Sequence, residues 1–196
     1  MTPLGLPTSV MGLLGCVEKR LKADCPRGYR MAQTGRDQIR IAFRLSNVDG
    51  IHLSLLVSTD ALNLSLIVDG HPALECLHKT LSTDRERLLG CLDYLPDYSL
   101  SVYVWTAEGV SHPRYLPVVQ LCLRYTSASH DPQRCALGYV TNLLPSLSMP
   151  RLQIERSLPG NEVQRMTQPV LEKWVLEEIE LLRCLGIFIA GFGQDT

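Results

Sequence analysis

Three consecutive stretches of the chain alternate between apolar and polar residues with a period of two. They cover residues 39–45, 51–57 and 62–68. Successive side chains of a strand point to opposite faces of a sheet, so each stretch predicts a strand with one buried face. The links over 46–50 and 58–61 are short and rich in turn-forming residues, which favours antiparallel neighbours. The chain is therefore predicted to contain a three-stranded antiparallel meander.

Helical periodicity flanks this meander on both sides. Apolar residues at helical spacing predict one helix over 9–22 and another over 71–95. The segment 82–84 consists of capping residues that would kink the second helix or divide it. Residues 100–105 alternate again and predict a fourth strand. Residues 1–126 are therefore expected to form an α+β domain, with a mainly antiparallel sheet in α-β-β-β-α-β order packed against helices.

Residues 127–196 are expected to form a helical extension packed on that core, or to belong to one single domain with it. In the long C-terminal helix the glutamates, Glu178 among them, are predicted to face outward, and Pro169 either kinks the helix or marks its start. The later elements are a strand over 118–125, a short helix over 134–144, a short strand over 152–156, a long helix over 161–185 and an apolar tail over 187–192.

Composition and charge narrow the classes of protein that this chain can belong to. Hydrophobic residues make up 45% of its 196 residues, which is typical of a globular protein and excludes a disordered one. With 19 basic and 20 acidic residues the net charge is −1, which argues against a globally basic nucleic-acid binder. The longest late apolar stretch, 181–192, is too short for a membrane span, so none is expected.

The cysteines indicate a reducing compartment. There are seven, an odd number, and they form no C-x-x-C pair, so neither a zinc ribbon nor a thioredoxin-type motif is present. Scattered thiols in a chain of this size are typical of a reduced intracellular protein, and a cytoplasmic location is expected.

Motifs that carry catalytic chemistry are missing from the sequence. It contains no G-x-S-x-G nucleophile elbow, no P-loop, no Rossmann glycine fingerprint and no H-E-x-x-H zinc motif. His71, Glu75 and His78 share one face of a predicted helix and could in principle hold zinc, but a solvent-exposed face explains them as well. We therefore assign no catalytic residue, no metal and no cofactor, and favour a protein that is not an enzyme.

Two families have a similar order of elements. The order helix, three-stranded meander, helix, strand resembles the core of the PD-(D/E)xK nucleases, which hold Mg²⁺ with acidic residues and use an acid-x-Lys pair on the third strand. The third strand here contains no such pair, and no lysine lies between Lys22 and Lys79. With a fifth strand and a final helix, the order also resembles the type III secretion chaperones, dimeric modules that wrap an extended segment of another protein.

Arginine and aromatic residues are the candidates for binding, because they are enriched at interaction hot spots. Arginines around the first predicted strand could contact an acidic partner or phosphates, and a solvated sheet face is the alternative for them. Helix 161–185 could instead cover the aromatic residues of the fourth strand. The candidate partner-binding residues are Arg36, Arg40, Arg44, Tyr103, Trp105, Trp174, Ile187 and Phe188.

These observations favour a non-catalytic interaction or regulatory subunit that binds a protein partner, or a second copy of itself, in the manner of an adaptor or chaperone. This interpretation is based on the missing catalytic motifs and on apolar surface beyond what one domain would bury. The alternative is a nuclease-like fold that binds nucleic acid through the arginine strip without a recognisable catalytic motif.

Overall fold

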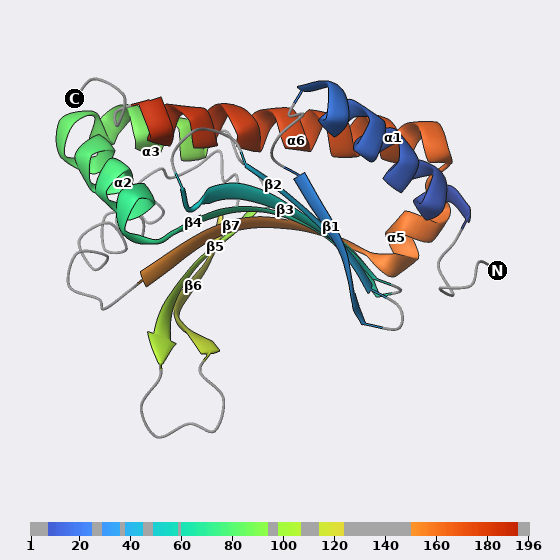
Figure 1. The fold of residues 1–196 in the computed structure, drawn as a ribbon, viewed down its shortest axis with the longest axis horizontal. Coiled ribbons are helices and arrows are strands. Elements are labelled where there is room, and N and C mark those ends of the chain that lie inside the picture. Colours follow the sequence, from blue (N-terminus) through green and yellow to red (C-terminus); the bar gives the residue numbers. More distant parts are fainter. Residues whose placement is uncertain are drawn as a thin grey trace, which may run out of the picture.

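One antiparallel sheet organises the structure, a computed structural model that describes residues 8–24, 29–35, 38–44, 49–58, 60–93, 98–106, 114–123 and 150–191. Within these residues, seven strands pair in the order β1-β2-β3-β4-β7-β5-β6 (Figure 1). The strands are β1 (Tyr29–Gly35), β2 (Gln38–Arg44), β3 (Ile51–Ser58), β4 (Ala61–Asp69), β5 (Tyr98–Thr106), β6 (Arg114–Leu123) and β7 (Pro150–Pro159).

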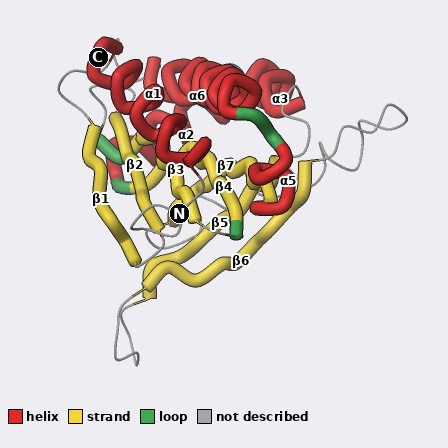
Figure 2. The backbone as a smooth tube through the Cα atoms, turned by 90° about the vertical axis from the view of Figure 1, so that its right-hand side faces the viewer, coloured by secondary structure: helices red, strands yellow, loops and turns green. Residues whose placement is uncertain are grey.

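The long helices lie together on one face of this sheet (Figure 2). The helices are α1 (Thr8–Asp24), α2 (His71–Thr83), α3 (Arg85–Asp93), α5 (Gly160–Arg165) and α6 (Gln168–Gly191). The longest, α6, runs along the sheet and contacts α1, α2, β3 and β4. The result is a two-layer architecture, in which each layer buries the apolar side of the other.

The core lies between these layers and follows from the two periodicities of the sequence. The odd-numbered residues 51–57 of β3 and the even-numbered residues 62–68 of β4 are buried. From α6, Leu171, Val175 and Leu182 meet them at helical spacing, and each is fully buried. Burying one such side chain contributes about 1.5–3 kcal/mol relative to leaving it in water.

The predicted α+β class is confirmed: the sheet is antiparallel, helices pack against it, and the C-terminal part contains a long helix. The predicted meander is also confirmed as β2, β3 and β4, which are antiparallel neighbours in the sheet. The element order differs, however, because four strands precede α2 and three follow α3. Both family resemblances therefore lack one strand in the first half of the observed fold, and in the second half the chaperone-like order lacks one strand and the nuclease-like order lacks two.

The added strands are β1 and an extended β7. β1 was not predicted, and it pairs only with β2, at the edge of the sheet. β7 was predicted as a short strand over 152–156, whereas it spans ten residues and lies between β4 and β5. Strands from both sides of residue 127 thus share one sheet.

The long C-terminal helix is divided where Pro169 marks the start of α6. Met166 has an extended backbone conformation between α5 and α6. A proline in the first turn of a helix sacrifices no hydrogen bond, but it cannot continue a helix that precedes it. The predicted apolar tail is instead the last turns of α6 up to Gly191, with Ile189 buried. The predicted strand over 118–125 corresponds to β6, and the predicted helix over 134–144 lies outside the described residues.

Candidate functional site

The face of the sheet opposite the long helices is predominantly polar. Residues that are paired across neighbouring strands point to the same face of the sheet, and successive residues of one strand point to opposite faces. The residues that alternate with the core positions therefore lie together on the other face. We call this side the polar face. It comprises Arg40 of β2, the even-numbered residues 52–58 of β3, and the odd-numbered residues 61–69 of β4, 151–157 of β7 and 99–103 of β5.

One end of the polar face carries a cluster of charged and aromatic side chains. Arg151 of β7 binds Asp69 of β4, with its Nε and Nη2 atoms 2.9 and 2.7 Å from Oδ2. Tyr103 of β5 lies directly across from Arg151 on its other side. His52 of β3 is half-buried beside these groups; burial lowers its pKa, and Arg151 and the exposed Arg40 lower it further, while Asp69 opposes them. A largely neutral imidazole therefore lies among two guanidinium groups and a carboxylate at neutral pH.

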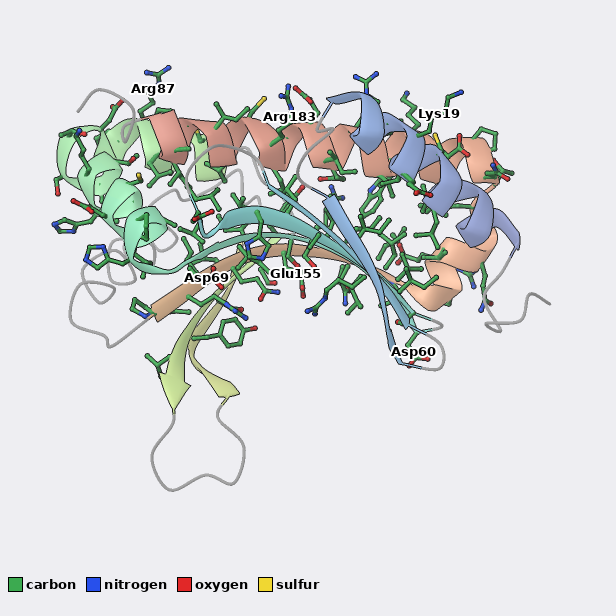
Figure 3. All side chains as sticks on the ribbon, viewed as in Figure 1. Lys19, Asp60, Asp69, Arg87, Glu155 and Arg183 are labelled. Carbon is green, nitrogen blue, oxygen red and sulfur yellow. The ribbon has the colours of Figure 1, made fainter. Side chains whose placement is uncertain are left out.

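The centre of the polar face is a hydrogen-bonded network around Glu155. Ser65 donates to Glu155 Oε2 at 2.8 Å, and Gln153 Nε2 donates to the same oxygen at 2.8 Å. Ser54 and Ser65 are paired across β3 and β4, and both are buried. Figure 3 shows Glu155 and Asp69 on this side of the sheet. The polar face thus presents negative as well as positive groups.

A second polar cluster is buried between the sheet and α6. Glu178 of α6 accepts a hydrogen bond from Tyr98 of β5 and forms an ion pair with Arg156 of β7. The Arg156 guanidinium lies 5.4 Å from the ring centre of Trp174 and 5.7 Å from that of Tyr98. Burial raises the pKa of Tyr98, and its hydrogen bond to Glu178 adds to this, so the phenol stays protonated. The cluster joins three elements and has the character of a structural clamp.

Glu178 corrects a prediction made from the sequence. It was expected to face outward with the other glutamates of its helix, but its exposed fraction is only 6%. It lies seven residues after Leu171, in the stripe that faces the sheet, and Arg156 neutralises its charge there. Sequence reasoning also missed Arg156, whose only signal is a charged residue at an alternate, core-facing position of β7.

The outer surface of the helical layer carries a small apolar ridge. Leu181 and Ile187 are 38% and 41% exposed, and Cys184 between them is also exposed. We call these three residues the outer ridge. Phe188 next to it is half-buried, and the guanidinium of Arg87 from α3 lies 5.1 Å from its ring centre. Arg87 and Arg183 project outward from this layer in Figure 3.

The predicted binding residues therefore do not form one patch. Arg40 and Tyr103 lie on the polar face, so α6 does not cover Tyr103, whereas Ile187 and Phe188 belong to α6 in the helical layer, where Ile187 is exposed and Phe188 is half-buried against the core. Trp174 is half-buried beside Arg156. Three candidates are not located by their side chains: Arg36 lies outside the described residues, and only the backbones of Arg44 and Trp105, in β2 and β5, are described.

His71 and Glu75, considered as zinc ligands with His78, form an exposed contact at the start of α2. His71 Nδ1 lies 3.8 Å from Glu75 Oε2, with 91% and 75% of the two side chains exposed. In the part of the chain that the structure describes, no group of three His, Cys, Asp or Glu side chains is arranged to hold a metal ion. The four cysteines with described side chains, Cys16, Cys76, Cys91 and Cys184, are free thiols.

No protein-family model matches the chain, and neither does any curated protein sequence. Among the described helices, none combines the length and the apolar character needed to cross a membrane.

Proposed function

We propose that this chain is a non-catalytic interaction or regulatory subunit, and that its polar face docks a protein partner. The observation that supports the proposal most directly is the grouping of Arg40, His52 and Tyr103 on one continuous side of the sheet. Arginine and aromatic side chains are the types that contribute most at protein interfaces. Arg40 is exposed and has no ion-pair partner among the residues that the structure describes.

The mixed charge of the polar face favours a protein over a nucleic acid as its partner. Asp69 already neutralises Arg151, and the Glu155 carboxylate occupies the centre of the face. A phosphate backbone laid across the sheet would meet these two carboxylates as well as the arginines, which weakens the electrostatic gain. A polypeptide offers donors, acceptors and both signs of charge, and it can match such a surface group by group.

Part of the polar face is accessible to a partner, although Ser54, Ser65, Ile67 and Ser101 on it are buried. The long helices cover the apolar face, and the core residues there are buried. On the polar face, by contrast, Tyr103, Gln153 and Glu155 are half-buried and Ser157 is exposed. Rigid strands hold these groups in fixed register, so a partner would meet a preformed surface, which reduces the entropy lost on binding.

Affinity capture from the native host tests this function when the proteins captured by the wild-type chain are compared with those captured by variants. The tagged protein is compared with the double variant Arg40→Glu/Tyr103→Ala, which changes two polar-face residues. The matched control is Arg165→Glu, the same charge reversal at an exposed arginine of α5. We expect proteins that co-elute with the wild-type chain and with the control to be lost from the double variant.

Two results would contradict the proposal. One is a set of co-eluting proteins that is the same for the wild-type chain and the double variant. The other is capture of nucleic acid that disappears with nuclease or added salt, which would support the alternative of nucleic-acid binding.

A further inference from the structure

The strand β1 forms one edge of the sheet and has an open side. Among the residues that the structure describes, β1 pairs with β2 alone, and no strand lies beyond it (Figure 1). Its register with β2 is regular from Tyr29 to Gln33 and shifts only before Gly35, at the end of the strand. A strand edge presents a row of backbone N–H and C=O groups that can pair with another strand. β1 is therefore a template for one more strand.

The opposite edge of the sheet is protected against such pairing. β6 forms that edge and contains Pro117, which has no backbone N–H to donate. The register between β5 and β6 also shifts there, between Val102 and Tyr103. Prolines and bulges are devices by which edge strands avoid added strands. β1 contains no proline, so an added strand is favoured at β1.

The charge next to the open edge is positive. Backbone register places the positions of Arg30 in β1 and Arg44 in β2 on the same face of the sheet as Arg40. The strands β1, β2 and β3 contain no acidic residue. Asp69 of β4, the next strand, already binds Arg151. The flank of the polar face along β1 and β2 therefore complements an acidic partner.

Arg40 is placed to reach an added strand across β1. It is exposed, and it is paired in register with Ala32 of β1, a residue whose side chain is a single methyl group. Strands of a sheet are about 4.7–4.9 Å apart, so an added strand would lie about 10 Å from β2. An arginine and a glutamate side chain together cover that distance, and they form a charge-assisted hydrogen bond where they meet.

We propose that the open edge of β1 pairs with an extended acidic segment of the partner protein, which adds a strand to the sheet and directs its carboxylates onto the polar face. This inference rests on the proposed docking function and names the part of the partner that docks. In strand addition, main-chain hydrogen bonds supply affinity and alternate side chains supply specificity. A nucleic acid could meet the arginines, but it cannot continue the backbone ladder of β1.

A second copy of this chain fits the open edge less well. Two β1 strands paired antiparallel about a two-fold axis perpendicular to the sheet would place both polar faces on the same side. The arginines of the two copies would then adjoin, with no acidic residue on β1, β2 or β3 of either copy. Like charges placed opposite one another on neighbouring strands are destabilising. The charge of this edge therefore favours an acidic chain over a second copy.

Fluorescence anisotropy with designed peptides tests the charge. The probe is a labelled peptide of alternating glutamate and threonine, as long as the 7 residues of β1, and the comparison peptide has lysine in place of glutamate. The full chain should bind the glutamate peptide, and Arg40→Glu should bind it about tenfold more weakly. Arg165→Glu, the same reversal on α5, should bind it as the wild type does. Absence of binding, equal binding of the lysine peptide, or equal weakening in both variants would overturn the proposal.

N-methylation of the peptide tests the backbone ladder without altering the protein. Alternate amides of an added strand face its neighbour. Methylation of one alternate set should therefore abolish binding, while methylation of the other set, at the same charge and length, should leave it. Equal effects of the two methylations would overturn strand addition. A single-stranded oligonucleotide of the same charge that binds as tightly as the glutamate peptide would also contradict it.

The two proposals can fail separately. Suppose that the double variant Arg40→Glu/Tyr103→Ala loses captured proteins while the wild-type chain binds no glutamate peptide. Docking on the polar face would then stand, and strand addition at β1 would be excluded. A peptide that binds with the expected pattern, together with unchanged capture by the double variant, would instead support strand addition and contradict docking on the polar face.

Discussion

Replacement of Glu178 by alanine tests the buried clamp between α6 and the sheet. The carboxylate binds the Arg156 guanidinium and accepts the hydrogen bond of Tyr98. Only 8% of the Glu178 side chain and 25% of the Arg156 side chain are exposed. Without Glu178, the guanidinium would remain between two aromatic rings with no counter-charge within this cluster.

The cost can be worked out from this environment. Breaking a buried ion pair by removing one partner typically costs about 3–5 kcal/mol, because the other charge is left uncompensated. Arg156 keeps some contact with water, so we expect the lower end, about 3 kcal/mol. For a chain of this length that corresponds to a fall in Tm of about 6–12 °C. Replacing both partners by apolar residues, as in Glu178→Leu/Arg156→Met, should cost less than Glu178→Ala, because no charge is then left unpaired.

Urea unfolding followed by circular dichroism measures these differences in unfolding free energy. Glu177→Ala is the control, because Glu177 is the neighbouring residue and makes only an exposed ion pair with Lys173 at 3.7 Å. Its removal should cost less than about 0.5 kcal/mol. The reasoning is refuted if Glu178→Ala costs no more than Glu177→Ala, or if the apolar double variant is much less stable than Glu178→Ala.

Three further predictions concern the backbone and two titrating groups. Gly50→Ala should lower the free energy of unfolding, measured with denaturant, far more than Gly70→Ala. Both glycines have positive φ, but a Cβ at Gly50 would overlap the carbonyl oxygen of Asp69, while nothing lies within 4 Å of a Cβ at Gly70. Equal losses for the two variants would contradict this. Burial raises the pKa of Tyr98, so its contribution to stability is full below about pH 10 and falls above it, as the unfolded chain releases the proton first; a Tyr98→Phe variant with the same alkaline profile would be inconsistent with this. Burial lowers the pKa of His52, so stability falls as the pH drops below about 6.5 and the unfolded chain binds the proton first; an NMR titration that gives His52 an ordinary or raised pKa would count against the described cluster.

Elements with a clear periodicity could be predicted from the sequence. β2, β3 and β4 each alternate between apolar residues that face the core and mostly polar residues on the other face, so the alternation of residues was enough to define them. β1 has no such alternation, and its place depends on backbone pairing with β2 alone. β7 alternates only as far as Ile154, because the next core-facing position holds Arg156. Its insertion between β4 and β5 joins residues far apart in the chain, which no local pattern reports.

The candidate site was predicted only in part, because alternation along a strand shows which face a residue lies on but not which strands are neighbours. Alternation along β2 placed Arg40 opposite the core, and the structure brings Tyr103 to the same face. The pairing of Arg151 with Asp69 requires β7 next to β4 and could not be read from the sequence. Apolar character alone did not distinguish exposed Ile187 from half-buried Trp174. Their exposure depends on how α6 is rotated against the sheet and, for Trp174, on its contact with Arg156.

Hydroxyl-radical footprinting of the chain, alone and with a co-purified protein partner, tests the central claim most directly. Mass spectrometry then reports the oxidation of each side chain. We predict that Tyr103 and His52 lose reactivity when the partner binds, while Trp174 of α6, in the helical layer, is unchanged. Tyr103 and His52 that remain as reactive in the complex as in the free chain would contradict docking on the polar face.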